Sequence, residues 1–345
     1  FEELQLIDVA SVTVDLGTND AAFTGSADSV TVNDGALRSY AGLTGVNIST
    51  GGGVDTLVLN ESSYLNTADA DVLTIDLGDG VDQVQAGADG DFTLADDSLS
   101  LNDGVATGNV TLDGFTTAGR GEDVTLAGGD GDNAFDVSDH TGAVSVSGGD
   151  GTDTLTGQNA NDATWTLEDA QDGVGAAGTD NLIDGTAVDQ ANPAGTVTFN
   201  LIEEFIGGTG NDTFVVGAGV VTPIVSLDGG AGVNTLDITG GGGGQSVTLS
   251  GVGGGVGFAG DATGLLTSFD NITDLDTTGA GNTLTGADLD SVWTIDGATG
   301  SVTVAGQTLN FSGFTSLAGG IANDSFTVTD DSTVDITTDT AIGGT

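Results

Sequence analysis

The chain has 345 residues and carries 52 Asp and Glu against 2 Lys and Arg, so its formal net charge at pH 7 is −50. A nucleic-acid-binding protein needs a basic surface to displace counterions from phosphate, and a peripheral membrane protein needs similar basic patches. A membrane-spanning helix needs about 20 consecutive apolar residues, and the sequence has no such run. We therefore expect no nucleic-acid partner and no membrane span.

The acidic residues are mostly aspartates, because only seven of the 52 are Glu. Asp competes with the helix backbone for hydrogen bonds and prefers turns, and turns rich in Asp and Gly suit hard cations such as Ca²⁺. The hydrophobic fraction of 37% and the mean hydropathy of +0.11 are too high for a simple disordered tail. We expect a folded chain in which bound cations offset the self-repulsion of its charge.

The chain contains no cysteine and no methionine. The lack of cysteine excludes a disulfide scaffold, thiol catalysis and thiolate metal sites, and it is compatible with a location outside the cell. The sequence begins Phe1-Glu2-Glu3, without a start residue or a signal-peptide pattern, and it ends in Gly343-Gly344-Thr345. We expect it to be a segment of a longer chain.

Short apolar runs of strand length follow one another along the chain. With 61 glycines and 2 prolines, long helices are not expected. The runs alternate inward and outward residues, with Val and Thr favoured on a pleated surface, and they include residues 12–14, 57–59, 144–146, 197–199, 247–249 and 302–304. The predicted fold class is all-β.

A Gly-x-Gly-x-Asp/Asn pattern recurs between these runs. It begins at Gly51, Gly78, Gly119, Gly129, Gly149, Gly208 and Gly230, with a degenerate copy at Gly320. The spacing predicts coils of about 20–30 residues and an elongated parallel β-solenoid, similar to a β-helix or β-roll. We expect residues 1–118 to form a less regular acidic region of this solenoid, and residues 119–345 to form a repeat-bearing region continuous with it.

A longer repeat places the two tryptophans in equivalent positions. Trp165 follows a Thr-Leu-Thr-Gly segment that starts at Thr154, and Trp293 follows the same segment starting at Thr283. We expect both indoles to pack in the core rather than to bind a ligand.

The segments 148–155 and 207–214 resemble the hemolysin-type, or repeats-in-toxin, calcium-binding nonapeptide G-G-x-G-x-D-x-U-x. The resemblance implies a parallel β-roll whose glycine carbonyls and Asp carboxylates bind Ca²⁺ between neighbouring coils. The implied metal ligands are Asp55, Asp82, Asp123, Asp153, Asp212 and Asp324, with Asp79, Asp130 and Asp150 between the glycines as second candidates. Asn133 and Asn234 stand where the pattern expects Asp.

The motifs are not in tandem every nine residues, which is where this chain departs from that family. Either the calcium sites take ligands from coils without the motif, or some motifs are only tight turns. The composition is also similar to the repetitive regions of large bacterial surface proteins, namely adhesins, matrix fibres and S-layer proteins.

These features favour a non-catalytic extracellular structural protein, in which a Ca²⁺-stabilised β-solenoid forms part of a surface filament, S-layer or adhesin stalk. Its expected partners are neighbouring copies that join end to end. The alternatives are a module that binds cell-surface glycans or ice, and a β-helix enzyme that degrades polysaccharides. A lyase of that kind needs a basic residue, and Arg38 and Arg120 are the only Lys or Arg residues.

The single histidine, His140, lies in an Asp-His-Thr-Gly segment. We expect it to be a turn residue rather than a catalytic base. No phosphate-binding loop is present.

Overall fold

The computed structural model describes residues 11–15, 27, 29–32, 45–60, 73–77, 79–102, 107–113, 123–158, 162–168, 183–190, 195–218, 220, 224–329 and 334–337. Within these ranges the chain is all-β, as expected, and its one short helix is the 3₁₀ turn η2 (Thr239–Gly241). All six predicted strand runs lie in strands. No helix in this part of the chain is long and apolar enough to span a bilayer.

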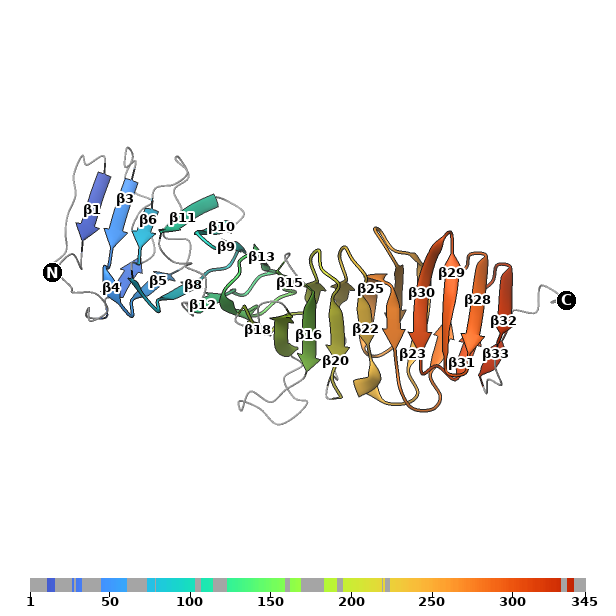
Figure 1. The fold of residues 1–345 in the computed structure, drawn as a ribbon. Coiled ribbons are helices and arrows are strands. Elements are labelled where there is room, and N and C mark those ends of the chain that lie inside the picture. Colours follow the sequence, from blue (N-terminus) through green and yellow to red (C-terminus); the bar gives the residue numbers. More distant parts are fainter. Residues whose placement is uncertain are drawn as a thin grey trace. The chain divides into compact units, whose positions relative to one another are not determined.

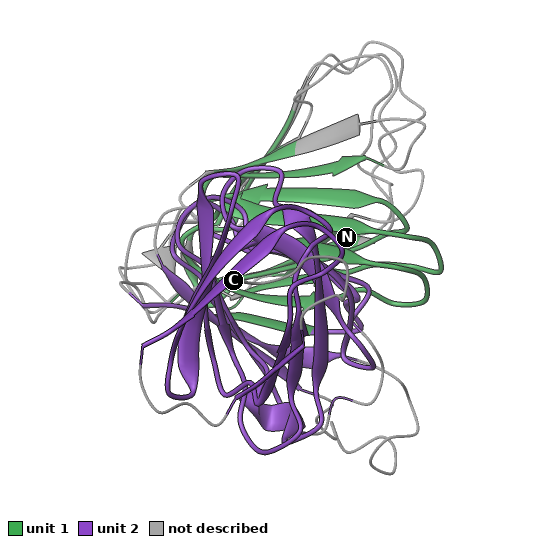
Figure 2. Cartoon of the chain, turned by 90° about the vertical axis from the view of Figure 1, so that its right-hand side faces the viewer, with its two compact units in different colours: residues 1–155, 192–199 green, residues 156–191, 200–345 purple. Residues whose placement is uncertain are grey.

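The chain divides into two compact units, which Figure 2 shows in green and purple. Unit 1 comprises residues 1–155 and 192–199, and unit 2 comprises residues 156–191 and 200–345. This is a division by compactness, so the expected difference in regularity between residues 1–118 and 119–345 stays a prediction. The short strand β15 (Thr154–Thr156) lies across the boundary.

Unit 1 contains two main sheets (Figure 1). One has the strand order β1 (Ser11–Asp15), β3 (Gly45–Ser49), β6 (Leu73–Asp76), β11 (Thr107–Asp113), β10 (Ser98–Asn102), β9 (Asp91–Ala95) and β13 (Ala134–Asp139). The other has the order β2 (Ser29–Val32), β5 (Thr56–Asn60), β8 (Gln83–Gly87), β12 (Asp123–Ala127), β14 (Ala143–Ser147) and β18 (Val197–Asn200). A small third sheet pairs β4 (Gly52–Gly53) with β7 (Asp79–Gly80).

Unit 2 repeats this architecture. One sheet has the order β19 (Glu204–Ile206), β21 (Ser226–Asp228), β25 (Leu266–Ile272), β24 (Phe258–Ala262), β23 (Ser246–Val252), β27 (Thr283–Thr285), β31 (Ser316–Ala318) and β33 (Asp335–Thr337). The other has the order β17 (Asp184–Asp189), β16 (Ala163–Glu168), β20 (Thr213–Val216), β22 (Thr235–Asp237), β26 (Asp274–Asp276), β30 (Gln307–Ser312), β29 (Thr299–Val304), β28 (Ser291–Asp296) and β32 (Asp324–Val328).

Within each unit the chain alternates between the two sheets and returns parallel to its earlier strand. We call one passage through both sheets a tier. The shortest returns take about one predicted coil, as in Val124 opposite Val144 and Phe214 opposite Leu236. This arrangement of two sheets with parallel pairing is compatible with a β-solenoid.

Antiparallel meanders interrupt the parallel pairing, and the sequence analysis did not anticipate them. β9, β10 and β11 form one in unit 1, and β23–β25 and β28–β30 form two in unit 2. The turn from β29 to β30 has positive φ at Ala305 (50°) and Gly306 (88°), the two-residue geometry that matches the twist of a hairpin. The β28–β30 meander lengthens the return to 33 residues, as in Trp293 opposite Phe326. β16 also pairs antiparallel with β17, and the return from Trp165 to Phe214 takes 49 residues.

The core is the line of inward residues that successive tiers stack on one another. Trp165 and Trp293 are both fully buried, which confirms their expected role. Their rings stack on Phe214 and Phe326 of the parallel neighbouring strand, with centroid distances of 5.4 and 5.3 Å. Leu236 lies opposite Phe214 in the next strand, so this ring is covered on both sides.

The stack predicts a large cost for truncating Phe214. We expect Phe214→Ala to lower the free energy of unfolding by about 3–5 kcal/mol, because it leaves a cavity between Trp165 and Leu236. Denaturant unfolding followed by tryptophan fluorescence measures the change. Val233→Ala is the control, because this valine lies in the turn before β22 and is 58% exposed. Equal effects of the two substitutions would contradict the stacked core.

Candidate functional site

The Asp or Asn that ends each well-described glycine-rich turn lies directly before, or at the start of, a strand. We call these residues the buried Asx set: Asp55, Asp82, Asn133 and Asp153 in unit 1, and Asp212, Asn234, Asn282 and Asp324 in unit 2. All are buried except Asp324, which is half-buried in the last described tier. The set contains five of the nine predicted metal ligands.

Five side chains of the set use one oxygen to accept a backbone N–H group of an earlier tier. Oδ1 of Asp82 accepts the N–H of Asp55 at 2.9 Å, and Oδ1 of Asp153 accepts that of Asn133 at 2.7 Å. In unit 2, Oδ1 of Asp212 accepts the N–H of Ala163 at 2.9 Å. These acceptors satisfy backbone donors that would otherwise be buried without a partner.

The asparagines of the set use their second polar atom as a donor. Asn234 accepts the N–H of Asp212 at 3.0 Å, and its Nδ2 donates to the carbonyl of Asn271 at 3.1 Å. Asn282 accepts the N–H of Gln245 at 2.9 Å, and its Nδ2 donates to the carbonyl of Gly313 at 3.1 Å. An amide thus binds both neighbouring tiers, because it has an acceptor and a donor.

Asp212 lies in the same surroundings as Asn234, but it has the oxygen Oδ2 where the asparagine has the donor Nδ2. A Cβ built on Gly207 would lie 2.6 Å from Oδ2 of Asp212 and 2.8 Å from the carbonyl oxygen of Gly229. On Gly229 it would lie 2.5 Å from Nδ2 of Asn234 and 2.6 Å from the carbonyl of Asn271, a pair that hydrogen bonds. Oδ2 of Asp212 is buried and has no hydrogen-bond partner, so it needs a proton or a cation to face a carbonyl.

The electrostatics of the buried aspartates follow from this setting. Burial raises the pKa of Asp212 from 3.8 to about 7; the charge of Asp162 adds to the shift and the N–H of Ala163 opposes it. Burial also raises the pKa of Asp153 and of Asp324. These three carboxyl groups therefore hold a proton more tightly in the folded protein than in the unfolded chain.

A second series of side chains lies on the solvent side of the same turns and hydrogen bonds in the opposite direction along the chain. Oδ1 of Asp132 accepts the N–H of Thr152 at 2.8 Å. In unit 2, Oδ1 of Asp162 accepts the N–H of Asn211 at 2.8 Å, and Asn211 in turn accepts the N–H of Val233 at 2.7 Å. Each tier is thus bound to its neighbour by one buried and one exposed acceptor.

Asp130 and Asp150, both predicted as second candidates, are exposed in successive turns of unit 1. The N–H of Asp150 donates to the carbonyl of Gly129 at 3.0 Å, which stacks the two turns. Asp89 and Asp132 are exposed beside them, and Oδ1 of Asp89 accepts the N–H of Gly131 at 3.1 Å. We call the group of Asp89, Asp130, Asp132 and Asp150 the exposed acidic turn, because all four carboxylates are open to solvent on neighbouring turns.

The two remaining predicted ligands are placed by their backbone alone. Asp79 pairs with Gly52 between β4 and β7, so residues 52–55 and 79–82 of the two motifs stack in register. Asp123 pairs with Gln83, which is one residue beyond the position of Asp82. The side chains of Asp79 and Asp123 lie outside the described part of the structure. Arg38 and Arg120 lie outside the described residues altogether.

The structure does not bring the predicted ligands into one cluster. Among the residues it describes, no group of three or more Asp, Glu or His side chains is arranged to hold a metal ion. The oxygen donors of the turns, carboxylates and main-chain carbonyls, are of the type that Ca²⁺ takes, but Ca²⁺ needs six to eight of them. A calcium site at these turns would have to complete its shell with main-chain oxygens and water.

Sequence reasoning missed several residues that bind neighbouring tiers. Asn282 follows Gly279-Ala280-Gly281, one residue shorter than the searched pattern, although its Thr-Leu-Thr-Gly continuation matches residues 154–157. Asp288 and Asp290 accept the N–H groups of Ile321 (3.2 Å) and Asn323 (3.0 Å) across the stack. No periodicity marks these two, because a meander of variable length separates the partners.

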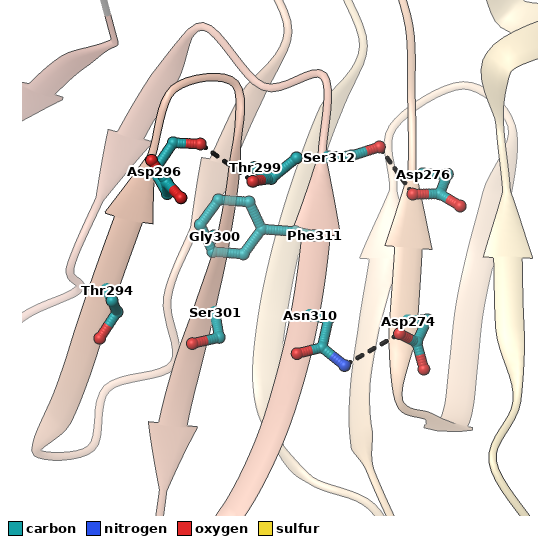
Figure 3. A pocket seen from close by; sticks show the side chains of 10 residues that line it. All are labelled: Asp274, Asp276, Thr294, Asp296, Thr299, Gly300, Ser301, Asn310, Phe311 and Ser312. Carbon is teal, nitrogen blue, oxygen red and sulfur yellow. Dashed lines mark hydrogen bonds between the residues drawn. The ribbon is translucent and has the colours of Figure 1, made fainter. Parts of the chain in front are cut away.

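An open groove of about 410 Å³ lies on unit 2 (Figure 3). Most of the residues that line it have polar side chains; the lining residues are Asp274, Asp276, Thr294, Asp296, Thr299, Gly300, Ser301, Asn310, Phe311 and Ser312. Asn310 donates to Oδ1 of Asp274 at 2.9 Å, and Ser312 donates to Oδ1 of Asp276 at 2.6 Å. Phe311 is only 4% exposed, so the groove offers carboxylates, an amide and hydroxyls rather than an aromatic platform.

His140 lies between β13 and β14, as expected for a residue between strands, and its side chain is buried. Its Nδ1 lies 3.4 Å from Oδ1 of Asp96. Burial lowers the pKa of the imidazole and the charge of Asp96 opposes this shift. The imidazole of His140 is thus packed between β13 and β14.

No family model, no curated protein and no solved structure matches this chain.

The raised pKa of Asp212 predicts a pH-dependent stability. The folded pKa lies above the unfolded value of 3.8, so the stabilisation by the bound proton is complete below pH 3.8 and is lost as the pH rises through about 7. We expect Asp212→Asn, measured in EDTA, to remove this dependence and to raise the free energy of unfolding at pH 8 by about 1–3 kcal/mol, because the amide donates to the carbonyl of Gly229.

The control is Asp130→Asn, which removes the same charge at an exposed position. We expect it to leave the pH dependence of unfolding between pH 4 and pH 8 unchanged. A parallel pH profile for Asp212→Asn and the unchanged protein would show that the carboxyl of Asp212 holds no proton in the folded state.

Proposed function

We propose that this chain is a non-catalytic extracellular structural protein, a Ca²⁺-stabilised β-solenoid segment of a surface filament, S-layer or adhesin stalk that assembles end to end. The observation that carries the proposal is the tiered stacking within each unit. In unit 2 the inward residues Phe214, Leu236, Leu275 and Phe311 follow one another across four parallel strands. A chain built this way extends by adding tiers, and each tier contacts only its neighbours.

The use of the motif residues supports a scaffolding role. The buried Asx side chains and the exposed acceptors of the turns are engaged in hydrogen bonds between tiers, as for Asp82 with Asp55 and Asp132 with Thr152. These groups hold the stack together, because their carboxylates accept hydrogen bonds from backbone N–H groups of neighbouring tiers and do not converge on a common cleft. A binding or catalytic role would have to be carried by other residues.

Two features of the chain support calcium binding, namely its net charge and the exposed acidic turn. A net charge of −50 opposes compaction, and the exposed acidic turn adds four solvent-exposed carboxylates on neighbouring turns. Ca²⁺ bound there by Asp130 and Asp150, with main-chain carbonyls and water, would screen this repulsion between stacked turns. The buried Asp212 site is less suited to Ca²⁺, because its geometry matches the hydrogen-bonded Asn234 site.

Calcium removal tests this proposal. We expect chelation to lower the melting temperature and reduce the far-UV β signal, and excess Ca²⁺ to restore both. The double variant Asp130→Asn, Asp150→Asn should raise the Kd for Ca²⁺ by about tenfold, because affinity depends on the number of charged ligands. Asp296→Asn, Asp335→Asn is the control, since both residues are exposed in unit 2. A melting temperature that EDTA leaves unchanged would remove the calcium claim.

Electron microscopy of the protein in Ca²⁺ and in EDTA tests the structural role itself. Filaments or layers that form in Ca²⁺ and disperse in EDTA are the expected result. Isolated particles at every Ca²⁺ concentration would contradict assembly and would favour a ligand-binding function.

The groove on unit 2 favours glycan binding as a second candidate. Sugar hydroxyls pair with carboxylates and amides such as those of Asp274, Asp276 and Asn310, which lie on two neighbouring strands. The absence of an exposed aromatic ring among the lining residues weighs against tight binding, because sugar rings commonly stack on such platforms.

A panel of surface polysaccharides distinguishes this candidate from scaffolding. If glycans bind in the groove, Asp274→Ala should weaken binding on an affinity gel by about tenfold or more, since removing one hydrogen-bonded charged group costs about 1.5–3 kcal/mol. Asp335→Ala is the matched exposed control. Release of reducing ends in the same assay would instead indicate the polysaccharide-degrading alternative.

A further inference from the structure

β32 lies at the end of its sheet in unit 2 and pairs with β28 on one side only among the described strands. The N–H of Ser291 donates to the carbonyl of Asn323 at 3.1 Å, and the N–H of Thr329 donates to the carbonyl of Ile295 at 2.9 Å. Main-chain polar groups alternate in direction along a parallel strand. Phe326 and Val328 therefore direct their N–H and C=O groups toward the outer edge of β32.

The core beside this edge is less covered than the core of the inner tiers. Phe326 stacks on Trp293 as Phe214 stacks on Trp165, yet Phe326 is half-buried while Phe214 is fully buried beneath Leu236. On the other sheet, Ile336 is likewise half-buried, although its partner Leu317 in the preceding strand is fully buried.

Further apolar side chains surround the edge. Val328 at the end of β32 is 48% exposed, and Ile321 in the preceding turn is 68% exposed. Among the described residues, the edge of β32 thus combines main-chain groups that pair with no other strand and apolar side chains, which is the combination that recruits another strand.

β2 presents the complementary edge in unit 1. It lies at the end of its sheet and pairs in parallel with β5 among the described strands. Its inward residue Val30 is half-buried, whereas Leu57 and Val84 at the same position of the next two tiers are fully buried. β2 begins the parallel stack of its sheet in unit 1, as β32 ends the parallel stack of its sheet in unit 2 among the described strands.

We propose that the outer edge of β32 binds the outer edge of β2 of a second copy of this chain, in a parallel head-to-tail contact. The proposal rests on the structural function proposed above and specifies its partner and register. The register that continues the stack places Ser325 beside Ser29, Phe326 beside Val30 and Thr327 beside Thr31. A contact between two different surfaces of the same chain is heterologous and therefore continues from copy to copy.

The charges set the conditions for this contact. The six residues placed side by side carry no charge, so they do not repel one another locally. The repulsion comes from the net charge of each copy, −50, and it acts over distances that salt screens, about 10 Å at 0.1 M ionic strength. We therefore expect Ca²⁺ or raised NaCl to favour the contact between copies.

Cysteine cross-linking tests the register, because the chain has no cysteine of its own. Thr327 and Thr31 are both exposed on their strands, and neighbouring strands lie about 4.8 Å apart, within the range a disulfide spans. Mixing Thr327→Cys with Thr31→Cys under oxidising conditions in Ca²⁺ should give covalent dimers. The double variant Thr31→Cys, Thr327→Cys should give a ladder of longer products on a denaturing gel.

The control partner is Thr125→Cys, an exposed threonine on the inner strand β12. We expect it to cross-link to Thr327→Cys at least tenfold more slowly than Thr31→Cys does. Equal rates for both partners, or dimers of Thr327→Cys with itself at the rate of the mixture, would overturn the head-to-tail register.

A proline substitution tests the edge independently. Val328→Pro removes an outward N–H without removing a hydrogen bond to β28, and it should shorten or abolish filaments in electron microscopy. Val292→Lys is the control, because this valine is 54% exposed on β28 but does not lie at the edge, and it should leave filament length unchanged. Circular dichroism checks that both variants fold; if Val328→Pro does not, the cross-linking rates decide.

The outcomes separate this inference from the proposed function. Filaments that form with Val328→Pro and without the Thr31–Thr327 cross-link would overturn the β32 contact while the structural function stands. A protein that remains monomeric in Ca²⁺ and in high salt would contradict the proposed function as well. Slow amide exchange of Phe326 and Val328 in the monomer would show that the chain covers its own edge, which also overturns the contact.

Discussion

The close approach of main chain at the turns is the constraint on which the rest of the structure depends. A Cβ built on Gly149, whose φ is 108°, would lie 2.2 Å from the carbonyl oxygen of Gly129 in the neighbouring turn. Only glycine fits at this distance in this conformation. Turns packed this closely exclude water, so their buried N–H groups must find acceptors inside the protein. The Asp and Asn residues of the motif supply those acceptors.

This requirement gives the aspartates a structural role that their resemblance to calcium ligands does not reveal. A buried Asp needs only one of its oxygens to accept an N–H group. Its second oxygen then faces a main-chain carbonyl, to which the Nδ2 of an Asn would donate a hydrogen bond. The comparison of Asp212 with Asn234 shows the difference within a single pair of tiers. The buried carboxyl can face that carbonyl as a neutral acid. The proposed cation binding uses other carboxylates, which are exposed to solvent.

The stacking also connects local chemistry to assembly. Each inner tier buries its aromatic or aliphatic residue between two neighbours, as Phe214 is buried between Trp165 and Leu236. The last described tier has only one neighbour, so the same rules that stabilise the interior leave Phe326 and the outer main chain of β32 available. Stability within the chain and the proposed attachment between chains then depend on one interaction, the parallel pairing of a strand with the next tier. The net charge of −50 opposes both, which is why the proposal includes cations.

The strand class, the positions of the six apolar runs and the burial of Trp165 and Trp293 can be predicted from the sequence, because alternation and repeat spacing depend on neighbours in the chain. The turns can be located as well, since a glycine pattern marks a backbone that admits no side chain. The fold is needed to show that the carboxylates of Asp82 and Asp212 point inward and that Asp130 and Asp150 are exposed. The reason is that the partner of each side chain lies 20–49 residues away, and the inserted meanders vary that distance. Local sequence cannot encode which backbone N–H a carboxylate will meet across a stack of tiers.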